Sequence, residues 1–499
     1  MPTIPLPQDP NLGQLRNQAR ELQRATRAGD AHALATVAEF YPGAPPARQF
    51  PLSAAQLVIA RRYRFDSWAR LRRHVTIVTA RAWSPGAPPQ DEPLPDRFLR
   101  LACLTYTDDE ASDRAAAAQL LADHPELPRV SLRVAAACAD VASVRRLLAA
   151  DRSAAACPGG PYGWSPLLYQ AYARHDPQVS LAATLETARL LLDAGADPND
   201  GRFWHGLPTP FTVLTGVLGY GEHSQPWHPH AIPFARLLLR AGADPNDGQV
   251  LYNRMFGDSD DHLALLFEFG LGQERVGIGP WHRLLGDQLE SPTVMLRNLL
   301  WWAVTHDQRD RVTLLAANGV DVLAPFTEAR HSDQPSRTPA EEALVNGHRE
   351  LTAQLVNLGA QLPRLSPADA FVSAAMAGDA EAVRRTDPAI ISAVRESRPG
   401  LVTWAASQGA PNSVELLVRA GFDVNVFGRS DIPVEGPWHT ALHVAAANGN
   451  LDLARKLLAL GANPRLRDKH HNSTPLGWAR HFARRPLIQL LGHAHSQDV

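Results

Sequence analysis

The sequence has little cysteine, almost no lysine and no long apolar run. Only Cys103, Cys138 and Cys157 occur in 499 residues, too few and too scattered to hold so long a chain together by disulfides. Lys456 and Lys469 are the only lysines, a bias toward arginine that is typical of a GC-rich bacterial genome. No apolar run reaches the roughly 18 residues that a membrane span needs. The first residues lack a basic stretch followed by an apolar one, so we predict no secretory signal and a cytoplasmic location.

Sequence motifs with a known catalytic mechanism are also missing. The chain contains no phosphate-binding G-x-x-x-x-G-K-[ST] loop, no G-x-S-x-G turn, no C-x-x-C and no H-E-x-x-H. Gly216, Gly219 and Gly221 lie in an insertion and not after a strand, so they do not indicate a dinucleotide site. We therefore predict that the protein is not an enzyme and needs no cofactor.

One group of residues has the side chains of a metal site, because imidazole and carboxylate groups suit zinc or a similar ion. Its members are His223, His228, His230, Asp258, Asp260, Asp261 and His262. Their spacing matches no closed zinc site, so we predict no metal. A metalloprotein or enzyme built on these loops remains the third hypothesis for function.

The composition is that of a folded chain, with 45% hydrophobic and 20% charged residues. Net charge is only −2, but it is unevenly placed. Residues 1–78 hold eleven arginines against five acidic residues, whereas the remainder of the chain is acidic. The chain thus has a basic head and an acidic body.

The segment from Trp438 to Asp468 has the clearest pattern. Its apolar residues follow helical spacing twice, and Asn448-Gly449-Asn450 separates the two runs. Thr440 is placed to cap the first predicted helix, and Gly461 to end the second in a left-handed conformation. We predict two short helices back to back.

This segment resembles an ankyrin repeat, whose T-P-L-H-x-A-A, G, L-L and G-A-D/N pattern recurs about every 33 residues. His443 and Gly449 are in register with that pattern. The resemblance extends over 96–494 as about ten repeats, and it is strong at 163–200, 207–247, 338–360 and 401–491. It implies an all-α solenoid of stacked helix pairs with short β-turn fingers, since one repeat cannot bury its own apolar face.

We predict a small basic helical domain at residues 1–80, ahead of the repeats. The prolines of residues 81–95 favour a linker there. Expected caps are Asp9 or Asn11, Ser53 and Ser67, and Gly29 ends the first helix. A helix-turn-helix outline there carries six arginines: Arg61, Arg62, Arg64, Arg70, Arg72 and Arg73. The alternative hypothesis for function is a nucleic-acid-associated regulator that uses these arginines. The other interpretation of the same arginines is a basic helix face that is only exposed to solvent.

Aromatic residues in the finger segments favour a protein partner, because aromatic and arginine side chains anchor interfaces. The resemblance places fingers and inner helices on the concave, partner-binding surface. The predicted partner-binding residues are Phe203, Trp204, His205, Trp227, Tyr252, Arg254, Phe256, Phe326, Phe427 and Trp438. We therefore predict a non-catalytic scaffold or adaptor that binds another protein, with no membrane partner.

Overall fold

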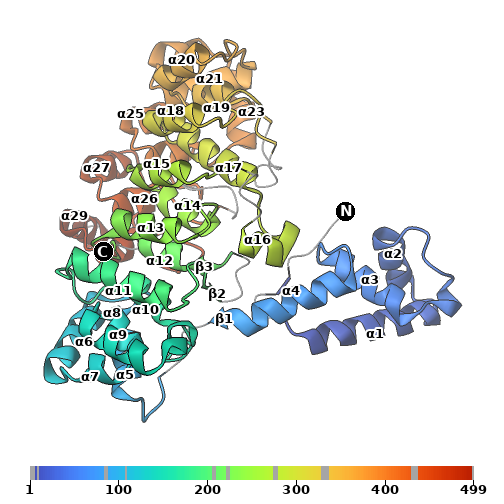
Figure 1. Ribbon diagram of the computed structural model, residues 1–499. Helices are drawn as coiled ribbons and strands as arrows, with labels where there is room; N and C mark the ends of the chain where they lie inside the picture. The colour runs from blue at the N-terminus through green and yellow to red at the C-terminus, as the bar shows by residue number, and fades with distance from the viewer. Residues whose placement is uncertain are drawn as a thin grey trace. The chain divides into compact units, whose positions relative to one another are not determined.

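The computed structural model describes residues 6–7, 10–83, 88–106, 109–204, 209–220, 225–273, 279–327, 336–428 and 437–496. These residues are mostly helical, as the ribbon in Figure 1 shows. The chain divides into two compact units, Met1–Pro292 and Thr293–Val499. Each unit is described separately below. The predicted all-α repeat fold is confirmed.

Four helices form the N-terminal part of the first unit. They are α1 (Leu12–Ala28), α2 (Ala31–Phe40), α3 (Leu52–Arg62) and α4 (Trp68–Arg81). The Asn11 side chain caps α1, Ser67 caps α4, and Gly29 ends α1 with a φ of 80°. The prediction that Ser53 caps the third helix is wrong, because α3 already begins at Leu52 and Ser53 lies in its first turn. The helices enclose their own apolar core, which includes Phe50, Val58 and Leu71.

The rest of the first unit is a two-layer stack of short helices. In chain order they are α5 (Leu94–Ala102), α6 (Ala111–Asp123), α7 (Leu127–Val130), α8 (Leu132–Ala137), α9 (Val141–Ala150), α10 (Pro166–Tyr172), α11 (Leu181–Asp193), α12 (Val213–Leu218), α13 (Ala231–Arg240), α14 (Gly248–Met255), α15 (Asp261–Glu268) and α16 (Pro280–Leu285). Helices α8, α10, α12 and α14 pack in sequence along one layer, and α9, α11, α13 and α15 along the other. Alternate helices therefore stack on alternate helices, as in a solenoid.

A small sheet joins the N-terminal helices to this stack. Strand β1 (Ala82–Trp83) pairs in parallel with β2 (Gly201–Trp204), which pairs antiparallel with β3 (Phe211–Thr212). The strands β2 and β3 belong to one predicted finger, and β1 comes from the predicted linker. Helix α5 begins at Leu94, so both ends of residues 81–95 are in regular structure, and 84–87 lie outside the described residues.

The second unit continues the same alternation. Its helices are α17 (Pro292–Thr305), α18 (Arg309–Ala317), α19 (Pro339–Val345), α20 (Arg349–Asn357), α21 (Pro367–Met376), α22 (Ala380–Arg385), α23 (Pro388–Ser397), α24 (Leu401–Ser407), α25 (Pro411–Arg419), α26 (Ala441–Asn448), α27 (Leu451–Ala459), α28 (Pro475–His481) and α29 (Arg485–Ser496). Inner helices α24, α26 and α28 pack in order, as do outer helices α25, α27 and α29. Their facing sides form one continuous apolar core.

The segment from Trp438 to Asp468 folds as its sequence predicts. Thr440 and His443 form a reciprocal capping box at the start of α26. Gly449 and Gly461 take φ values of 74° and 92° after α26 and α27, a conformation in which a Cβ would be strained. His443 also bonds the Ser473 carbonyl through its Nε2, so its ring ties this repeat to the next.

Candidate partner-binding surface

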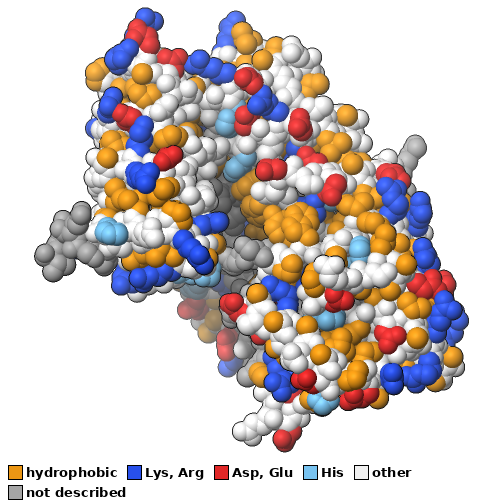
Figure 2. Space-filling view, turned by 90° about the vertical axis from the view of Figure 1, so that its left-hand side faces the viewer, with side chains coloured by type: hydrophobic (Ala, Val, Ile, Leu, Met, Phe, Trp, Pro, Cys, Tyr) orange, Lys and Arg blue, Asp and Glu red, His pale blue; other side chains and the backbone are white. Residues whose placement is uncertain are grey.

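Figure 2 shows hydrophobic, acidic and basic side chains interspersed over the face of the molecule that it presents. A binding surface must therefore be located by the burial and contacts of individual residues. The ten predicted partner-binding residues fall into three groups by exposure. Three are buried, three are half-buried and three are exposed, and His205 lies outside the described residues.

Phe203 is buried, so the expectation that it is an exposed finger residue is wrong. Its ring is 0% exposed and meets the Trp281 ring edge-on at 5.3 Å. Val78 from α4 completes the same apolar cluster. The Arg81 guanidinium lies 5.0 Å from the centre of the Trp281 ring. The chain's own residues around β1 therefore cover this finger.

Trp204 stands next to Phe203 on β2 and is half-buried. Its ring lies 6.1 Å from that of Phe211 on the paired strand. Trp83, which pairs with Trp204, is itself buried against Tyr162 and Trp164. Most of the aromatic surface of this finger is thus used in packing within the first unit.

Phe326 is also buried, again contrary to the prediction of an exposed finger. The Arg297 guanidinium lies over its ring at 4.7 Å and donates hydrogen bonds to the carbonyls of Asp321, Ala324 and Pro325. Arg297 is buried as well. This arginine and Phe326 therefore hold their own loop in place.

Phe427 and Trp438 are half-buried in the fingers of the last repeats. The Lys469 ammonium lies 4.8 Å from the Phe427 ring centre. Trp438 stacks on His470 at 4.5 Å and packs at 5.3 Å on Trp478. These contacts leave little of either ring available as an anchor.

The three exposed residues, Trp227, Tyr252 and Phe256, all lie in the first unit. They are 44%, 39% and 43% exposed, respectively. Trp227 stacks on Tyr220 at 4.4 Å with the planes 20° apart. Tyr252 and Phe256 lie one turn apart at the end of α14, with rings 5.3 Å apart and at 89° to each other. We call Tyr220, Trp227, Tyr252 and Phe256 the aromatic surface.

Arg254 lies against the Trp227 ring and is 1% exposed. Its guanidinium carbon is 4.0 Å from the centre of the Trp227 ring, and it donates to the Leu218 carbonyl at 3.2 Å and to the Asp261 carboxylate. The adjacent His262 ring and, after it, the Arg254 charge hold the pKa of Asp261 well below its usual range. Arg254 was predicted to contact the partner directly. Its burial instead makes it a support of the Trp227 ring.

The loop that carries Trp227 is fixed by a second buried arginine, which sequence reasoning missed. Arg174 donates through Nε to the Pro226 carbonyl at 3.0 Å and through Nη2 to the Gly216 carbonyl at 2.6 Å. Burial lowers its pKa to about 10, so it stays protonated at neutral pH. Gln225 adds a hydrogen bond to Asp109 at 2.6 Å. Arg174 belongs to no repeat motif. Its partners are backbone carbonyls, which give no signal in the sequence.

His228 and His230 are also anchors of this loop. His228 is buried and its Nδ1 accepts a hydrogen bond from the His230 amide, while the His230 ring bonds the Val179 carbonyl. Burial lowers the pKa of His228 well below its usual value, with the Arg174 charge as the next cause. Among the described residues no group of three or more potential ligands is arranged to hold a metal ion. His223 lies outside the described residues.

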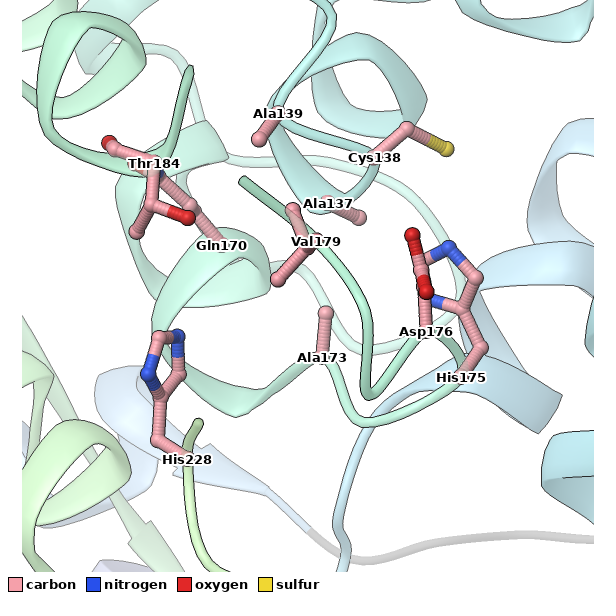
Figure 3. A pocket seen from close by; sticks show the side chains of 10 residues that line it. All are labelled: Ala137, Cys138, Ala139, Gln170, Ala173, His175, Asp176, Val179, Thr184 and His228. Atoms are coloured by element: carbon pink, nitrogen blue, oxygen red, sulfur yellow. The ribbon is translucent and has the colours of Figure 1, made fainter. Parts of the chain in front are cut away.

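A small cavity adjoins His228, and Figure 3 shows its lining. His175 and Asp176 stand on one side of it, and His228, Gln170 and Thr184 on the other. Gln170 donates to the Thr184 carbonyl at 2.8 Å. The cavity has room for about one water molecule, so it could not hold a substrate or cofactor.

The six arginines of the predicted helix-turn-helix do not form one uniform surface. Arg61 donates to the Phe40 carbonyl and lies over the Tyr41 ring, and Arg70 pairs with Asp66. Arg62 is half-buried. Arg64, Arg72 and Arg73 are exposed.

Comparison with known families agrees with the C-terminal part of this fold. Residues 402–499 match the family model of ankyrin repeats, in three copies. That range covers α24 to α29, whose regular helix pairs are described above. None of the described helices is long and apolar enough to cross a bilayer. The last part of the chain therefore consists of ankyrin repeats.

Proposed function

We propose that the protein is a non-catalytic scaffold or adaptor that binds another protein through the aromatic surface and the inner-helix and finger residues around it. Ankyrin repeats generally mediate protein–protein interaction. The observation that carries the proposal is the exposure of three large aromatic side chains, Trp227, Tyr252 and Phe256, in the first unit. Such rings are favoured at the centres of interfaces.

The support beneath these rings is consistent with a binding role. Tyr220 stacks on Trp227, and Arg254 holds both the Trp227 ring and the end of α12. A Trp227 ring fixed in this way loses little conformational freedom when a partner binds, so less of the binding free energy is lost to ordering. All three cysteines are free thiols, which fits the cytoplasmic location that we include in the proposal.

The test is cross-linked capture from native extract with the full-length chain. We expect wild-type protein to retain a partner, and Tyr252→Ala with Phe256→Ala to lose it. Leu362→Ala, which truncates a 77% exposed side chain elsewhere, is the matched control and should retain the partner. Retention by the double variant would overturn the proposed surface.

A second candidate function uses the exposed arginines Arg64, Arg72 and Arg73. They give the basic head a charge that could neutralise nucleic-acid phosphates. Nucleic-acid binding of this kind should weaken steeply as salt is raised. No binding of duplex DNA by the full-length chain at low salt would exclude it.

A further inference from the structure

Helix α1 carries four arginines on one side. Arg16, Arg20, Arg24 and Arg27 follow each other at intervals of three or four residues. At 3.6 residues per turn, this spacing brings all four onto one side of the helix, roughly 5–6 Å apart along its axis. All four are exposed. We call them the α1 arginine stripe.

Another side of α1 fixes the helix to the rest of the N-terminal helices. Leu15 and Ala19 are buried in the apolar core there. The Phe50 carbonyl accepts hydrogen bonds from Gln23 at 3.2 Å and from Arg27 Nε at 2.9 Å. The helix is therefore held in place by side chains outside the stripe and by Arg27, the last member of the stripe.

The charges of the α1 arginine stripe are not neutralised by the chain's own carboxylates. Among the described residues none of the four arginines forms an ion pair, and Arg20 has only a long contact of 3.5 Å with Asn17. Several exposed arginines on other helices do pair with carboxylates: Arg145 with Glu186, Arg349 with Asp379 and Arg419 with Glu415. Like charges one turn apart repel each other, so the stripe is complementary to a ligand that carries several negative charges.

The other side chains of α1 favour a phosphate backbone over an acidic protein segment. The helix has no aromatic residue, and its three leucines are buried or half-buried. A protein interface depends on apolar and aromatic anchors, whereas phosphates are held by arginine and by polar groups. Gln14 and Asn17 are exposed polar residues of the same helix. Single strands are usually held by aromatic stacking, so the lack of aromatic rings favours a duplex.

We infer that the α1 arginine stripe binds the sugar–phosphate backbone of duplex DNA without regard to base sequence. Each guanidinium can donate two hydrogen bonds to one phosphate. This surface is separate from Arg64, Arg72 and Arg73, and the inference does not rest on the adaptor function. It adds a second kind of ligand to the protein.

The test measures fluorescence anisotropy of short labelled duplex DNA of random sequence with the full-length chain, over a series of salt concentrations. We expect binding at low salt that weakens steeply as salt is raised. A polyglutamate peptide of the same net charge should bind at least about fivefold more weakly than the duplex. Single-stranded DNA of the same length should also bind more weakly.

The deciding variant is Arg16→Gln with Arg20→Gln and Arg24→Gln. Glutamine and arginine have similar helix propensity, and these side chains are exposed, so α1 should keep its fold. Duplex affinity at low salt should fall at least about tenfold, and the slope of log affinity against log salt should become shallower by about 3. The same three positions changed to lysine keep the charge and should retain most of that slope.

The matched control removes three exposed arginines that are paired with carboxylates in the second unit. They are Arg384 and Arg385, which pair with Glu381, and Arg419, which pairs with Glu415. Changing these three to glutamine alters net charge by the same amount and should leave duplex binding unchanged. An equal loss in this control would show that only net charge matters, and would overturn the inference.

Three further results would overturn it. The first is no duplex binding by the wild-type chain at low salt, or binding that the α1 glutamine variant leaves unchanged. The second is a lysine variant that loses as much affinity as the glutamine variant, which would indicate a structural role. The third is polyglutamate or single-stranded DNA bound as tightly as the duplex, which would identify a different ligand.

The outcomes also separate this inference from the functions proposed above. If Arg72→Gln with Arg73→Gln abolishes duplex binding and the α1 glutamine variant does not, the second candidate function stands and the stripe falls. Capture of a protein partner is measured on the aromatic surface, so a failure to bind DNA leaves the adaptor function standing.

Discussion

The repeat from Trp438 to Asp468 and the irregular segment from Asp247 to Gly272 use their polar and aromatic groups differently. In the regular repeat, Thr440 and His443 cap each other, and Trp438 stacks on His470. In the segment from Asp247 to Gly272, Tyr252 and Phe256 are exposed, whereas Arg254 between them in the sequence is buried. The regular repeat uses its side chains to hold the stack together. The segment from Asp247 to Gly272 leaves these two rings partly exposed to solvent.

The largest expected effect lies in the regular repeat. Leu457 is fully buried in the core of α27, so Leu457→Ala should reduce the free energy of unfolding by about 2–5 kcal/mol. Urea unfolding of the full-length chain followed by circular dichroism measures it. A loss below about 1 kcal/mol would show that the repeat core is looser than its burial indicates.

Arg254→Met should have the next largest effect, because it removes the support of the aromatic surface. The lost ion pair, carbonyl hydrogen bond and ring contact should together cost about 1–3 kcal/mol, discounted because Asp261 is 49% exposed. The matched control is Arg236→Met, which breaks a more exposed pair with Glu268 and should reduce the free energy of unfolding less than Arg254→Met does. Equal losses in the two variants would contradict a special role for Arg254.

Low pH should reduce the stability of the first unit, because two buried histidines lie beside the Trp227 loop. Burial lowers the pKa of His175 to about 4 and holds that of His228 well below its usual value. The unfolded chain therefore binds protons below about pH 6.5 that the folded chain does not, so stability present above pH 6.5 is lost as pH falls. The interval from pH 7.5 to 5.5 lies above the pKa values of most carboxyl groups. Over this interval each of the two histidines should reduce the free energy of unfolding by about 1 kcal/mol.

Urea midpoints at those two pH values test this effect. His175→Gln should reduce the pH dependence, whereas His493→Gln, which alters an exposed ring, should leave it unchanged. Midpoints that do not move between pH 7.5 and 5.5 would contradict the burial of these rings as neutral imidazoles.

Phe256→Ala should have the smallest effect on stability. Its side chain is already 43% exposed, so the free energy of unfolding should change by less than about 1 kcal/mol, while partner binding falls. Comparing unfolding and capture for the same variant separates the two roles. A loss of stability as large as that of Leu457→Ala would place Phe256 in the core.

The sequence predicts features that depend on neighbouring residues better than those that depend on distant ones. Thr440, Gly449 and Gly461 could be assigned from spacing alone, because caps and left-handed turns are local. The burial of Phe203 could not, since it depends on Val78 and Trp281, each roughly 80 or more residues away in the chain.

The candidate site shows the same limit. Helical spacing places Tyr252, Arg254 and Phe256 at the end of one helix, but it does not show that Arg254 turns inward to Trp227 and Leu218. That orientation depends on the loop before α13, which Arg174 fixes through backbone carbonyls. The exposed rings could be predicted by residue type, and their buried supports could not.

Site-specific photo-cross-linking tests the central claim most directly. A benzophenone amino acid would replace Tyr252 in one full-length chain and Asn448, an exposed residue at the end of α26 in the regular repeats, in another. The adaptor proposal predicts a cross-linked partner from position 252 and none from position 448. A partner cross-linked from position 448 and not from 252 would contradict it and place binding on the regular ankyrin repeats.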